Sequence, residues 1–293
     1  MPETDPVEIS VAAALAAARD DLPGHMQAGR ETEILLGHAA GVSRSQLLAY
    51  PEHLLTIEQF DVFQNILRRR RNGEPIAYLT GCREFWSLPL KVSPATLIPR
   101  PETESLVEQT LIRLPCGDPL EILDLGTGCG AIALAIAGER DHCQVTGSDV
   151  SEDALRVARE NQDRLALQNV CWVQGSWYEA VADRKFDLIV SNPPYVATGD
   201  PHLGQGDLPH EPVLALASGE DGLDAIREII EGAASHLKRP GWLLLEHGFD
   251  QQKTVIELLI AASFDKVCGH QDLAGIPRVV SARLSTNRDT DND

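Results

Sequence analysis

A glycine-rich turn at residues 124–130 narrows the possible folds more than any other part of the sequence. It reads Asp124-Leu125-Gly126-Thr127-Gly128-Cys129-Gly130 and joins the apolar run 121–125 to the alanine-rich run 131–137. Glycines at alternate positions let the backbone turn sharply and let a ligand approach without Cβ atoms in the way. In open α/β sheets, ligands bind beyond the carboxyl ends of the strands. The turn therefore predicts a strand–turn–helix unit of an α/β sheet with a ligand site at its end.

Strand-like and helix-like runs alternate along the rest of the chain. After the strand 121–125 and the helix 131–137, the pattern predicts strands over 145–148, 170–173, 186–191, 242–246 and 278–284, and helices over 152–165, 225–237 and 251–262. This alternation is typical of a parallel or mostly parallel sheet in a doubly wound α/β domain.

The N-terminal part has a helical pattern instead. Apolar residues at helical spacing predict a helix over Ile9–Ala17, a second around Ile34–His38 and a third over Ile57–Leu67. A hairpin is expected over 84–92, and residues 99–104 open a further helix. The sequence thus predicts a helical domain over 1–82, a β-hairpin connector over 83–100, an α/β domain over 101–284 and a disordered tail over 285–293.

The charge balance disfavours nucleic acid as the main partner. The chain of 293 residues has 25 Lys and Arg against 44 Asp and Glu, which gives a net charge of −19. Binding to phosphates depends on Lys and Arg side chains that neutralise them, and anionic membrane surfaces attract the same residues. The acidic field is compatible with a basic protein as substrate.

The cysteines and the apolar runs point to a cytoplasmic protein. None of the six cysteines forms a Cys-x-x-Cys pair, so we expect reduced thiols and no metal site. The N-terminal residues lack the basic start and apolar core of a signal peptide, and no apolar run has the length of a membrane span. We also expect no contact with a membrane, and a monomer.

Asp149 adds a second element to the predicted ligand site. It ends the strand that follows the glycine turn, near the spacing at which an acidic side chain meets ribose hydroxyls. A purely structural turn would leave Asp149 unexplained. A dinucleotide site would place the third glycine one residue later. A P-loop would have a phosphate-binding lysine after the glycines, and its absence here excludes a P-loop.

Asn192-Pro193-Pro194-Tyr195 is the most specific stretch of the chain. It follows the strand 186–191, and its two prolines hold the backbone out of the helical region. The Asn192 side chain and the Pro193 carbonyl then offer two rigid acceptors, which can hold both N–H groups of a planar amide or aryl amine. Such orientation and fixed dipoles assist attack by this weakly nucleophilic nitrogen on a sulfonium methyl group. Tyr195 could pack flat on the target group.

Together these motifs resemble a known family. The glycine turn resembles the S-adenosylmethionine loop of class I methyltransferases, and with Asn-Pro-Pro-Tyr it resembles enzymes that methylate amide or exocyclic nitrogens. Further stretches are similar to the HemK/PrmC family of protein-glutamine methyltransferases, and the similarity covers nearly the whole chain. They are Gly73 to Gly81, Phe85, Leu97 to Glu104, Gly175 to Trp177 and Glu211 to Leu223.

The resemblance implies a fold, a reaction and a set of site residues. It implies a Rossmann-like sheet of seven strands with the last antiparallel, and an N-terminal helical bundle that helps to dock the substrate. The implied substrate is the glutamine of the Gly-Gly-Gln motif in class 1 peptide chain release factors, methylated on its side-chain nitrogen N5. Gly126, Thr127, Gly128, Cys129, Gly130, Asp149, Trp177 and Asn192 would line the cofactor, and Asn192, Pro193, Pro194 and Tyr195 would hold the glutamine amide, with Asn192, Pro193 and Tyr195 as the catalytic residues.

Other functions remain open from the residues alone. A sister enzyme that acts on a glutamine of a ribosomal protein would share nearly all these motifs. A DNA adenine-N6 methyltransferase would need a basic recognition region, which the charge of −19 opposes. A non-catalytic cofactor-binding module would not need an intact Asn-Pro-Pro-Tyr. Glu246 and His247 follow a strand and could be proposed as a base, but we interpret them as structural, because the methylated nitrogen can lose its proton to water.

Overall fold

The computed structural model describes residues 9–21, 28–115 and 117–285, and the chain divides into two compact units between Gly81 and Cys82. The expected disordered tail lies outside the described residues, apart from Ser285. Among the helices that the structure describes, none has the length and apolar character needed to cross a membrane.

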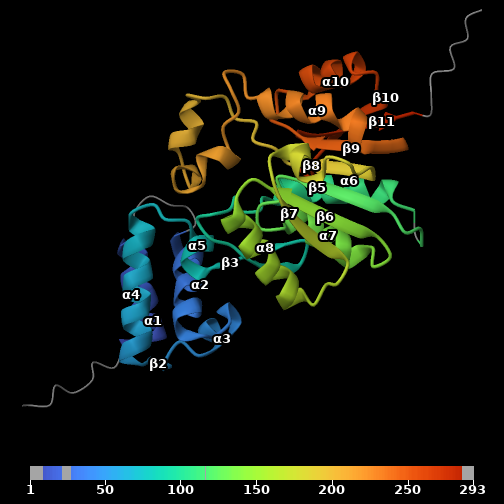
Figure 1. Cartoon of the computed structure of the whole chain (residues 1–293). Helices are drawn as coiled ribbons and strands as arrows, with labels where there is room; N and C mark the ends of the chain where they lie inside the picture. Colours follow the sequence, from blue (N-terminus) through green and yellow to red (C-terminus); the bar gives the residue numbers. More distant parts are fainter. Residues whose placement is uncertain (1–8, 22–27, 116, 286–293) are drawn as a thin grey trace, which may run out of the picture. The chain divides into compact units, whose positions relative to one another are not determined.

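The first unit is a small helical bundle with one short strand pair (Figure 1). Its elements are β1 (Ile9–Ser10), α1 (Val11–Asp21), α2 (Ala28–Ala40), α3 (Arg44–Ala49), β2 (Leu54–Leu55), α4 (Ile57–Arg71) and α5 (Ile76–Thr80). The prediction that Ile9 begins the first helix is wrong, because Ile9 pairs with Leu55 in an antiparallel bridge. The helices pack around a core that includes Leu35, Phe63 and Leu67.

Polar residues fix where the helices of this unit begin and end. Thr56 and Gln59 form a capping box at the start of α4, in which each side chain bonds the other residue's backbone N–H. At the other end of α4, Arg70 bonds the Glu31 carboxylate at 3.0 Å. The arginine run at residues 68–71 thus lies in the last turn of a helix, where the helix dipole favours positive charge.

The second unit is a three-layered α/β domain with a small hairpin. Its strands are β3 (Cys82–Phe85), β4 (Leu88–Lys91), β5 (Glu121–Leu125), β6 (Gln144–Asp149), β7 (Val170–Gln174), β8 (Phe186–Ser191), β9 (Leu237–Glu246), β10 (Asp265–Gln271) and β11 (Pro277–Leu284). Its helices are η1 (Pro101–Thr103), α6 (Glu104–Arg113), α7 (Ala131–Glu139), α8 (Glu152–Leu165), η2 (Trp177–Val181), η3 (Pro201–Gly204), η4 (Leu208–His210), η5 (Val213–Ala215), α9 (Asp224–His236) and α10 (Gln252–Ala261).

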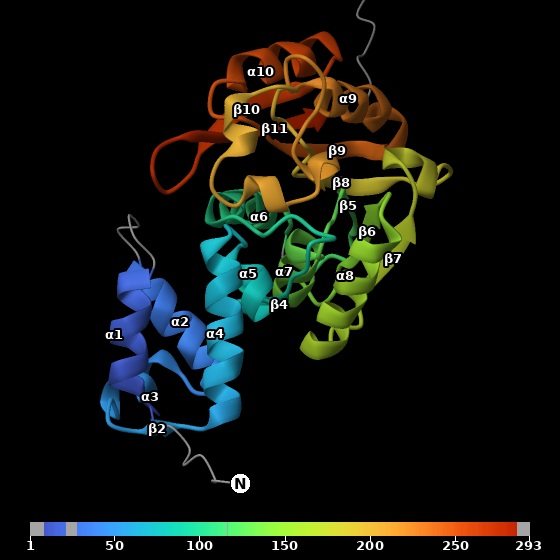
Figure 2. The same cartoon turned by 90° about the vertical axis from the view of Figure 1, so that its left-hand side faces the viewer.

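The large sheet has seven strands in the order β10-β11-β9-β8-β5-β6-β7. Strands β9, β8, β5, β6 and β7 are parallel, whereas β11 runs antiparallel between β9 and β10. Helices α6, α7 and α8 lie on one face of the sheet, and α9 and α10 lie on the other (Figures 1 and 2). The predicted Rossmann-like methyltransferase fold, with its last strand antiparallel, is confirmed.

Burial explains which strands the sequence could identify. The predicted bounds of β5 and β8 agree with the structure, and these central, mostly apolar strands are buried over nearly their whole length. The strand pattern missed β10, because this edge strand is mostly exposed and has no apolar alternation. It also began β9 late, at Trp242, because Pro240 and Gly241 interrupt the apolar run where the pairing with β8 shifts.

The hairpin β3–β4 belongs to the second unit by its contacts. Asn161 on α8 accepts a bond from the Lys91 backbone N–H at 2.6 Å and donates one to the Lys91 carbonyl at 3.0 Å. Its side chain also donates to the Cys129 carbonyl at 2.9 Å. One buried amide therefore ties the hairpin and the glycine turn to the same helix.

Candidate active site

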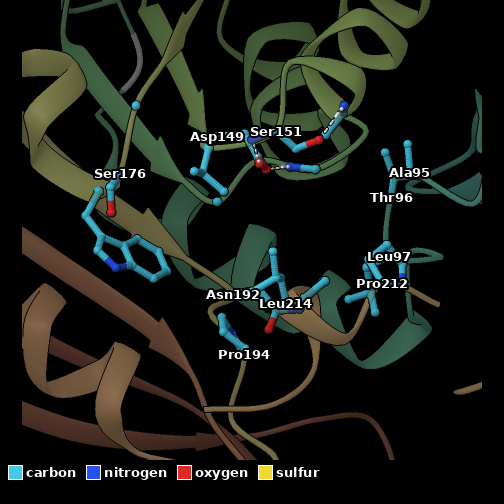
Figure 3. Close-up of a pocket in the computed structure, with 17 residues that line it drawn as sticks. Ala95, Thr96, Leu97, Asp149, Ser151, Ser176, Asn192, Pro194, Pro212 and Leu214 are labelled. Carbon is cyan, nitrogen blue, oxygen red and sulfur yellow. Dashed lines mark hydrogen bonds between the residues drawn. The ribbon is translucent and has the colours of Figure 1, made fainter. Parts of the chain in front are cut away.

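A cavity of about 440 Å³ lies at the carboxyl end of the parallel strands in the second unit (Figure 3). Residues that follow four neighbouring strands line it, together with residues from two loops. They are Gly126 and Gly128 after β5, Asp149 at the end of β6 with Val150, Ser151 and Ala154 after it, Gly175 to Trp177 after β7, Asn192 and Pro194 after β8, and Ala95 to Leu97, Pro212, Leu214 and Ala215 from the loops. Distant parts of the sequence thus meet where the fold predicts a ligand.

Strand pairing places these segments in order along the edge of the sheet. Leu125 at the end of β5 pairs with Ser191 of β8 on one side and with Ser148 of β6 on the other. The Ser191 hydroxyl also donates to the Leu125 carbonyl at 2.7 Å. The glycine turn therefore lies between the Asp149 segment and the Asn192 segment.

The five predicted residues of the glycine turn have different positions. Gly126 and Gly128 line the cavity and have φ values of 70° and 58°, which favour glycine. Gly130 precedes α7 with φ of 85°, packed so closely that a Cβ there would meet Trp172 at 2.8 Å. Thr127 and Cys129 are buried and do not line the cavity. They shape the turn, and two glycines present its backbone to a ligand.

Asp124 anchors the turn from within the core. Its carboxylate is 0% exposed and accepts bonds from the Thr127 hydroxyl at 2.5 Å and the Ala133 N–H at 3.2 Å. Burial raises the pKa of Asp124, and the two hydrogen bonds lower it. The effect of burial is larger, so the pKa is raised to about 7. The residue joins the start of α7 to the end of β5 and so sets the shape of the turn.

Asp149 faces the cavity from the end of β6 (Figure 3). One carboxylate oxygen accepts the Gly128 N–H and the other accepts the Ser151 N–H, both at 2.9 Å. Burial raises the pKa of Asp149, whereas these backbone bonds lower it. Each oxygen keeps a further lone pair, so the carboxylate can also accept from a ligand hydroxyl.

Trp177 forms part of the apolar wall. It begins η2, and its ring lies 3.6 Å from the position that a Cβ on Gly126 would have. Its φ of 41° is unusual for a residue other than glycine. The ring therefore lies in contact distance of the glycine turn, next to the cavity that it lines.

The Asn-Pro-Pro-Tyr segment divides between the cavity and the core. Asn192 and Pro194 line the cavity (Figure 3), whereas Pro193 is buried. No donor in the described part of the chain bonds the Pro193 carbonyl. The Tyr195 side chain is not part of the cavity lining and donates instead to Glu246 Oε1 at 3.2 Å. The two acceptors are available, and the half-buried Tyr195 packs against the core of the second unit.

Glu246 and His247 lie behind this segment, at the end of β9. Neither lines the cavity, and both are buried. Burial raises the pKa of Glu246 to about 7 and lowers the pKa of His247. His247 Nδ1 bonds the Gly248 carbonyl at 2.7 Å. This arrangement agrees with the interpretation that neither acts as a base on a ligand in the cavity.

Nothing in the sequence indicated that Glu211 joins the two loops that line the cavity. The Glu211 side chain is 0% exposed, accepts the Ile98 N–H at 3.0 Å and forms an ion pair with Arg100. Residues next to this contact, which are Ala95 to Leu97, Pro212, Leu214 and Ala215, line the cavity. Glu211 and Arg100 belong to the stretches that resemble the family, but only the fold shows that they meet.

The cavity fits the cofactor that the motifs predict. Gly126 and Gly128 leave room where a Cβ would stand, and Asp149 supplies a carboxylate acceptor. Trp177, Leu97 and Leu214 supply apolar surface for a planar base. The described residues contain no group of three or more His, Cys, Asp or Glu side chains arranged to hold a metal ion.

Comparison with known proteins identifies the family. Residues 13–81 match the model of the PrmC N-terminal domain, and residues 106–205 match the methyltransferase small domain. The release factor glutamine methyltransferase of Escherichia coli (strain K12) is 50% identical over 254 residues, which cover 87% of this chain and 91% of that protein. The chain belongs to the release factor glutamine methyltransferase family. Its motifs correctly indicated an S-adenosylmethionine-dependent methyltransferase.

The release factor glutamine methyltransferase family also includes a relative whose similarity covers nearly the whole chain. The Vibrio cholerae member is 46% identical over 286 residues, which cover 97% of this chain and 100% of that protein. A solved methyltransferase from Pyrococcus furiosus has the same fold, with a TM-score of 0.52 and 21% identity over 76% of this chain and 100% of that one.

Proposed function

We propose that this chain transfers a methyl group from S-adenosylmethionine to N5 of the glutamine in the Gly-Gly-Gln motif of class 1 peptide chain release factors. The observation that carries the proposal is the juxtaposition of Asn192 with the glycine turn at the edge of one cavity. A methyl donor at the turn and an amide at Asn192 would lie next to each other, because the turn and Asn192 follow the ends of the neighbouring strands β5 and β8. Relatives named for this activity support the substrate.

The cofactor would be held by the glycine turn and its neighbours. When bound, S-adenosylmethionine supplies a sulfonium methyl group as the electrophile. Gly126 and Gly128 present backbone without side chains, and Asp149 offers its remaining lone pairs to ribose hydroxyls. Trp177 offers an apolar face to the adenine ring. Thr127, Cys129 and Gly130 act indirectly, because they hold the shape of the turn.

The substrate amide would be held by two acceptors. Asn192 Oδ1 and the Pro193 carbonyl accept the two N–H groups of the glutamine, which fixes the nitrogen in position. They also stabilise the positive charge that develops on it. Pro194 keeps the backbone rigid, and Tyr195 holds the segment through Glu246. The methylated nitrogen then loses its proton to water, so no side chain needs to act as a base.

The rest of the chain supports a protein substrate. The net charge of −19 disfavours DNA and favours approach of a basic protein built to contact RNA. The helical unit up to Gly81 would help to dock that protein. We propose that the enzyme acts as a monomer in the cytoplasm, without nucleic acid or membrane.

Mass spectrometry with methyl-deuterated cofactor tests this proposal. The enzyme is incubated with a release factor, with ribosomal proteins and with duplex DNA in separate reactions. We expect a labelled methyl on the glutamine of the Gly-Gly-Gln motif, and none when that glutamine is replaced by glutamate. Label confined to a ribosomal protein or to adenine would refute the choice of substrate.

Asn192→Ala tests the role of the amide acceptor. Transfer should be abolished, whereas binding of the cofactor, measured by calorimetry, should change little. Asn169→Ala is a matched control for loss of a buried asparagine amide. Asn169 donates to the carbonyls of Ala137 in α7 and Cys143 after it, and it does not line the cavity, so this variant should lose stability and keep its turnover per folded molecule.

A further inference from the structure

A second cavity, of about 400 Å³, lies in the second unit beside η1. Three segments line this acidic cavity: η1 with the first turns of α6, the turn of the hairpin β3–β4, and the loop that joins β10 to β11. It shares no lining residue with the cofactor cavity. Pro101 and Glu102 of η1 line it, and the next residue, Thr103, accepts a hydrogen bond from Asn192 Nδ2 at 3.2 Å. One short helix therefore contacts both the acidic cavity and the proposed amide acceptor.

The lining of this cavity carries negative charge only. Glu102, Glu104, Glu108 and Asp272 line it, and no Lys, Arg or His does. Glu102 and Glu104 lie at the start of η1 and α6, where the helix dipole favours negative charge. Glu108 lies a full turn further along and repels Glu104, so the dipole does not account for it. In the part of the chain that the structure describes, no cation pairs with Glu102 or Glu108. A cation from a partner would therefore meet no competitor.

Asp272 shapes the loop that forms one side of the cavity. Its side chain is 4% exposed, and its Oδ1 accepts the N–H groups of Ala274 and Ile276, both at 2.9 Å. The Asp272 N–H donates to the Ile276 carbonyl at 2.9 Å. Its Oδ2 accepts no hydrogen bond from the described residues and lies 3.6 Å from Arg278 Nε. The loop thus has a fixed shape, and a buried carboxylate oxygen of the lining remains able to accept.

Apolar side chains stand next to these carboxylates. Leu273, at the tip of the loop, is fully exposed, Ile276 is 39% exposed, and both line the cavity. Trp86 lines it from the hairpin turn, where Glu104 accepts the Trp86 backbone N–H at 2.8 Å. The loop projects from the sheet (Figure 2). Exposed apolar side chains gathered at a cavity are typical of a protein contact, and a fixed loop reduces the entropy cost of binding.

The chemistry of the lining narrows the occupant. Four carboxylates oppose a nucleic acid, and a second copy of this chain, with its net charge of −19, would be repelled. The carboxylates are not arranged to hold a metal ion, since the described residues contain no such group. A protein segment with a cationic side chain next to an apolar one matches the lining in both charge and surface.

We propose that the acidic cavity docks the segment of the protein substrate that flanks the methylated glutamine. An Arg or Lys side chain of that segment would lie against Glu102 and Glu108, and an apolar side chain would pack on Leu273. The inference rests on the proposed function, because the release factor is the occupant. Since the lining touches neither the cofactor cavity nor Asn192, it would contribute to affinity for the protein and leave the transfer step unchanged.

The test measures KM for the intact release factor and kcat at saturating cofactor in variants of the full chain. Glu108→Lys should raise KM about 3- to 10-fold, because it removes an attraction and adds a repulsion. Leu273→Ala should raise KM about 10-fold through lost apolar burial. In both variants, kcat and the affinity for the cofactor, measured by calorimetry, should keep their wild-type values.

Two matched controls separate the cavity from general surface effects. Glu231→Lys makes the same change of net charge at an exposed carboxylate on α9, outside both cavities. Ile260→Ala truncates a side chain on α10 that is 59% exposed and also lies outside them. Both controls should keep the wild-type KM. An equal rise of KM in Glu108→Lys and Glu231→Lys would show overall steering by charge and would overturn the proposal.

A charge exchange identifies the contact on the substrate. Each Lys or Arg that flanks the Gly-Gly-Gln motif is changed to Glu in turn, and KM is measured with the wild-type enzyme and with Glu108→Lys. One of these changes should raise KM for the wild-type enzyme and lower it again for Glu108→Lys, because opposite charges then face each other. A set of substitutions without any such reversal would show that Glu108 meets no cation of the substrate.

Binding without transfer separates the two proposals. A release factor with Glu in place of the Gly-Gly-Gln glutamine cannot be methylated, and its affinity by calorimetry should fall by the same factors in Glu108→Lys and Leu273→Ala. A wild-type enzyme that methylates no release factor would refute the proposed function and this occupant with it. Methylation with an unchanged KM in both variants would refute the docking site alone. A changed oligomeric state of Leu273→Ala with unchanged KM would assign the cavity to a second copy and overturn the proposal as well.

Discussion

Two glycines in the same turn should respond very differently to alanine. Gly128 and Gly130 both have positive φ, at 58° and 85°. A Cβ on Gly128 would meet no atom within 4 Å, whereas a Cβ on Gly130 would lie 2.8 Å from Trp172, 3.0 Å from Leu134 and 3.2 Å from Ala158. Backbone strain is therefore common to both substitutions, and crowding affects only Gly130→Ala.

The structure gives magnitudes for the two substitutions. A left-handed backbone costs a residue with a Cβ about 1–2 kcal/mol, which is the whole expected loss for Gly128→Ala. Overpacking adds about 1–3 kcal/mol, so Gly130→Ala should lose about 2–5 kcal/mol of unfolding free energy. Both values are to be measured by urea denaturation without cofactor.

Cofactor binding should show the reverse order. Gly128 lines the cavity and Gly130 does not. The methyl group of Gly128→Ala would occupy space at the cofactor site, and a loss of about 1.4 kcal/mol would weaken binding tenfold by calorimetry. Gly130→Ala should bind nearly normally per folded molecule. Equal stability losses, or normal affinity in Gly128→Ala, would refute the assignment of one glycine to packing and the other to the ligand.

Three further predictions concern the cavity. Asp149→Ala should weaken cofactor binding by about 1–3 kcal/mol in calorimetry, and unchanged affinity would remove Asp149 from the ribose. Glu211→Gln, which loses the charge opposite Arg100 but keeps an acceptor, should increase proteolysis of the loop at 205–217 and weaken cofactor binding; a variant with wild-type proteolysis would show that the ion pair does not hold the loop. Burial raises the pKa of Cys129 to about 12, so this thiol should resist iodoacetamide at pH 8, whereas the exposed Cys171 should react. Equally fast labelling of the two cysteines would show that the glycine turn is accessible to solvent.

The sequence predicted the features that depend on local pattern. The apolar runs of β5 and β8 and the glycines between β5 and α7 are strong signals, because burial on both faces and positive φ restrict the allowed residues. Parallel strands place their carboxyl ends at one edge, so the meeting of Asn192 with the turn also followed from topology.

The features that the sequence missed depend on contacts between distant segments. Nothing near Thr103 indicates that its hydroxyl meets Asn192, and nothing near Glu211 indicates that it bonds Arg100. The direction of the Tyr195 ring depends on Glu246 in a strand that follows much later. Side-chain partners of this kind are set by packing in three dimensions, which residue patterns do not encode.

The pairing of β5 with β8 has a consequence for how such enzymes can diversify. The two strands are hydrogen-bonded neighbours up to Leu125 and Ser191, so the first residues beyond them are about one strand spacing apart, roughly 4.8 Å. Under the proposed function, the backbone ladder therefore sets the separation between the proposed methyl-donor site at the glycine turn and the proposed amide site at Asn192. The loop at 205–217 and the helical unit can then change in evolution to admit a different protein, while the distance over which the methyl group must travel stays the same.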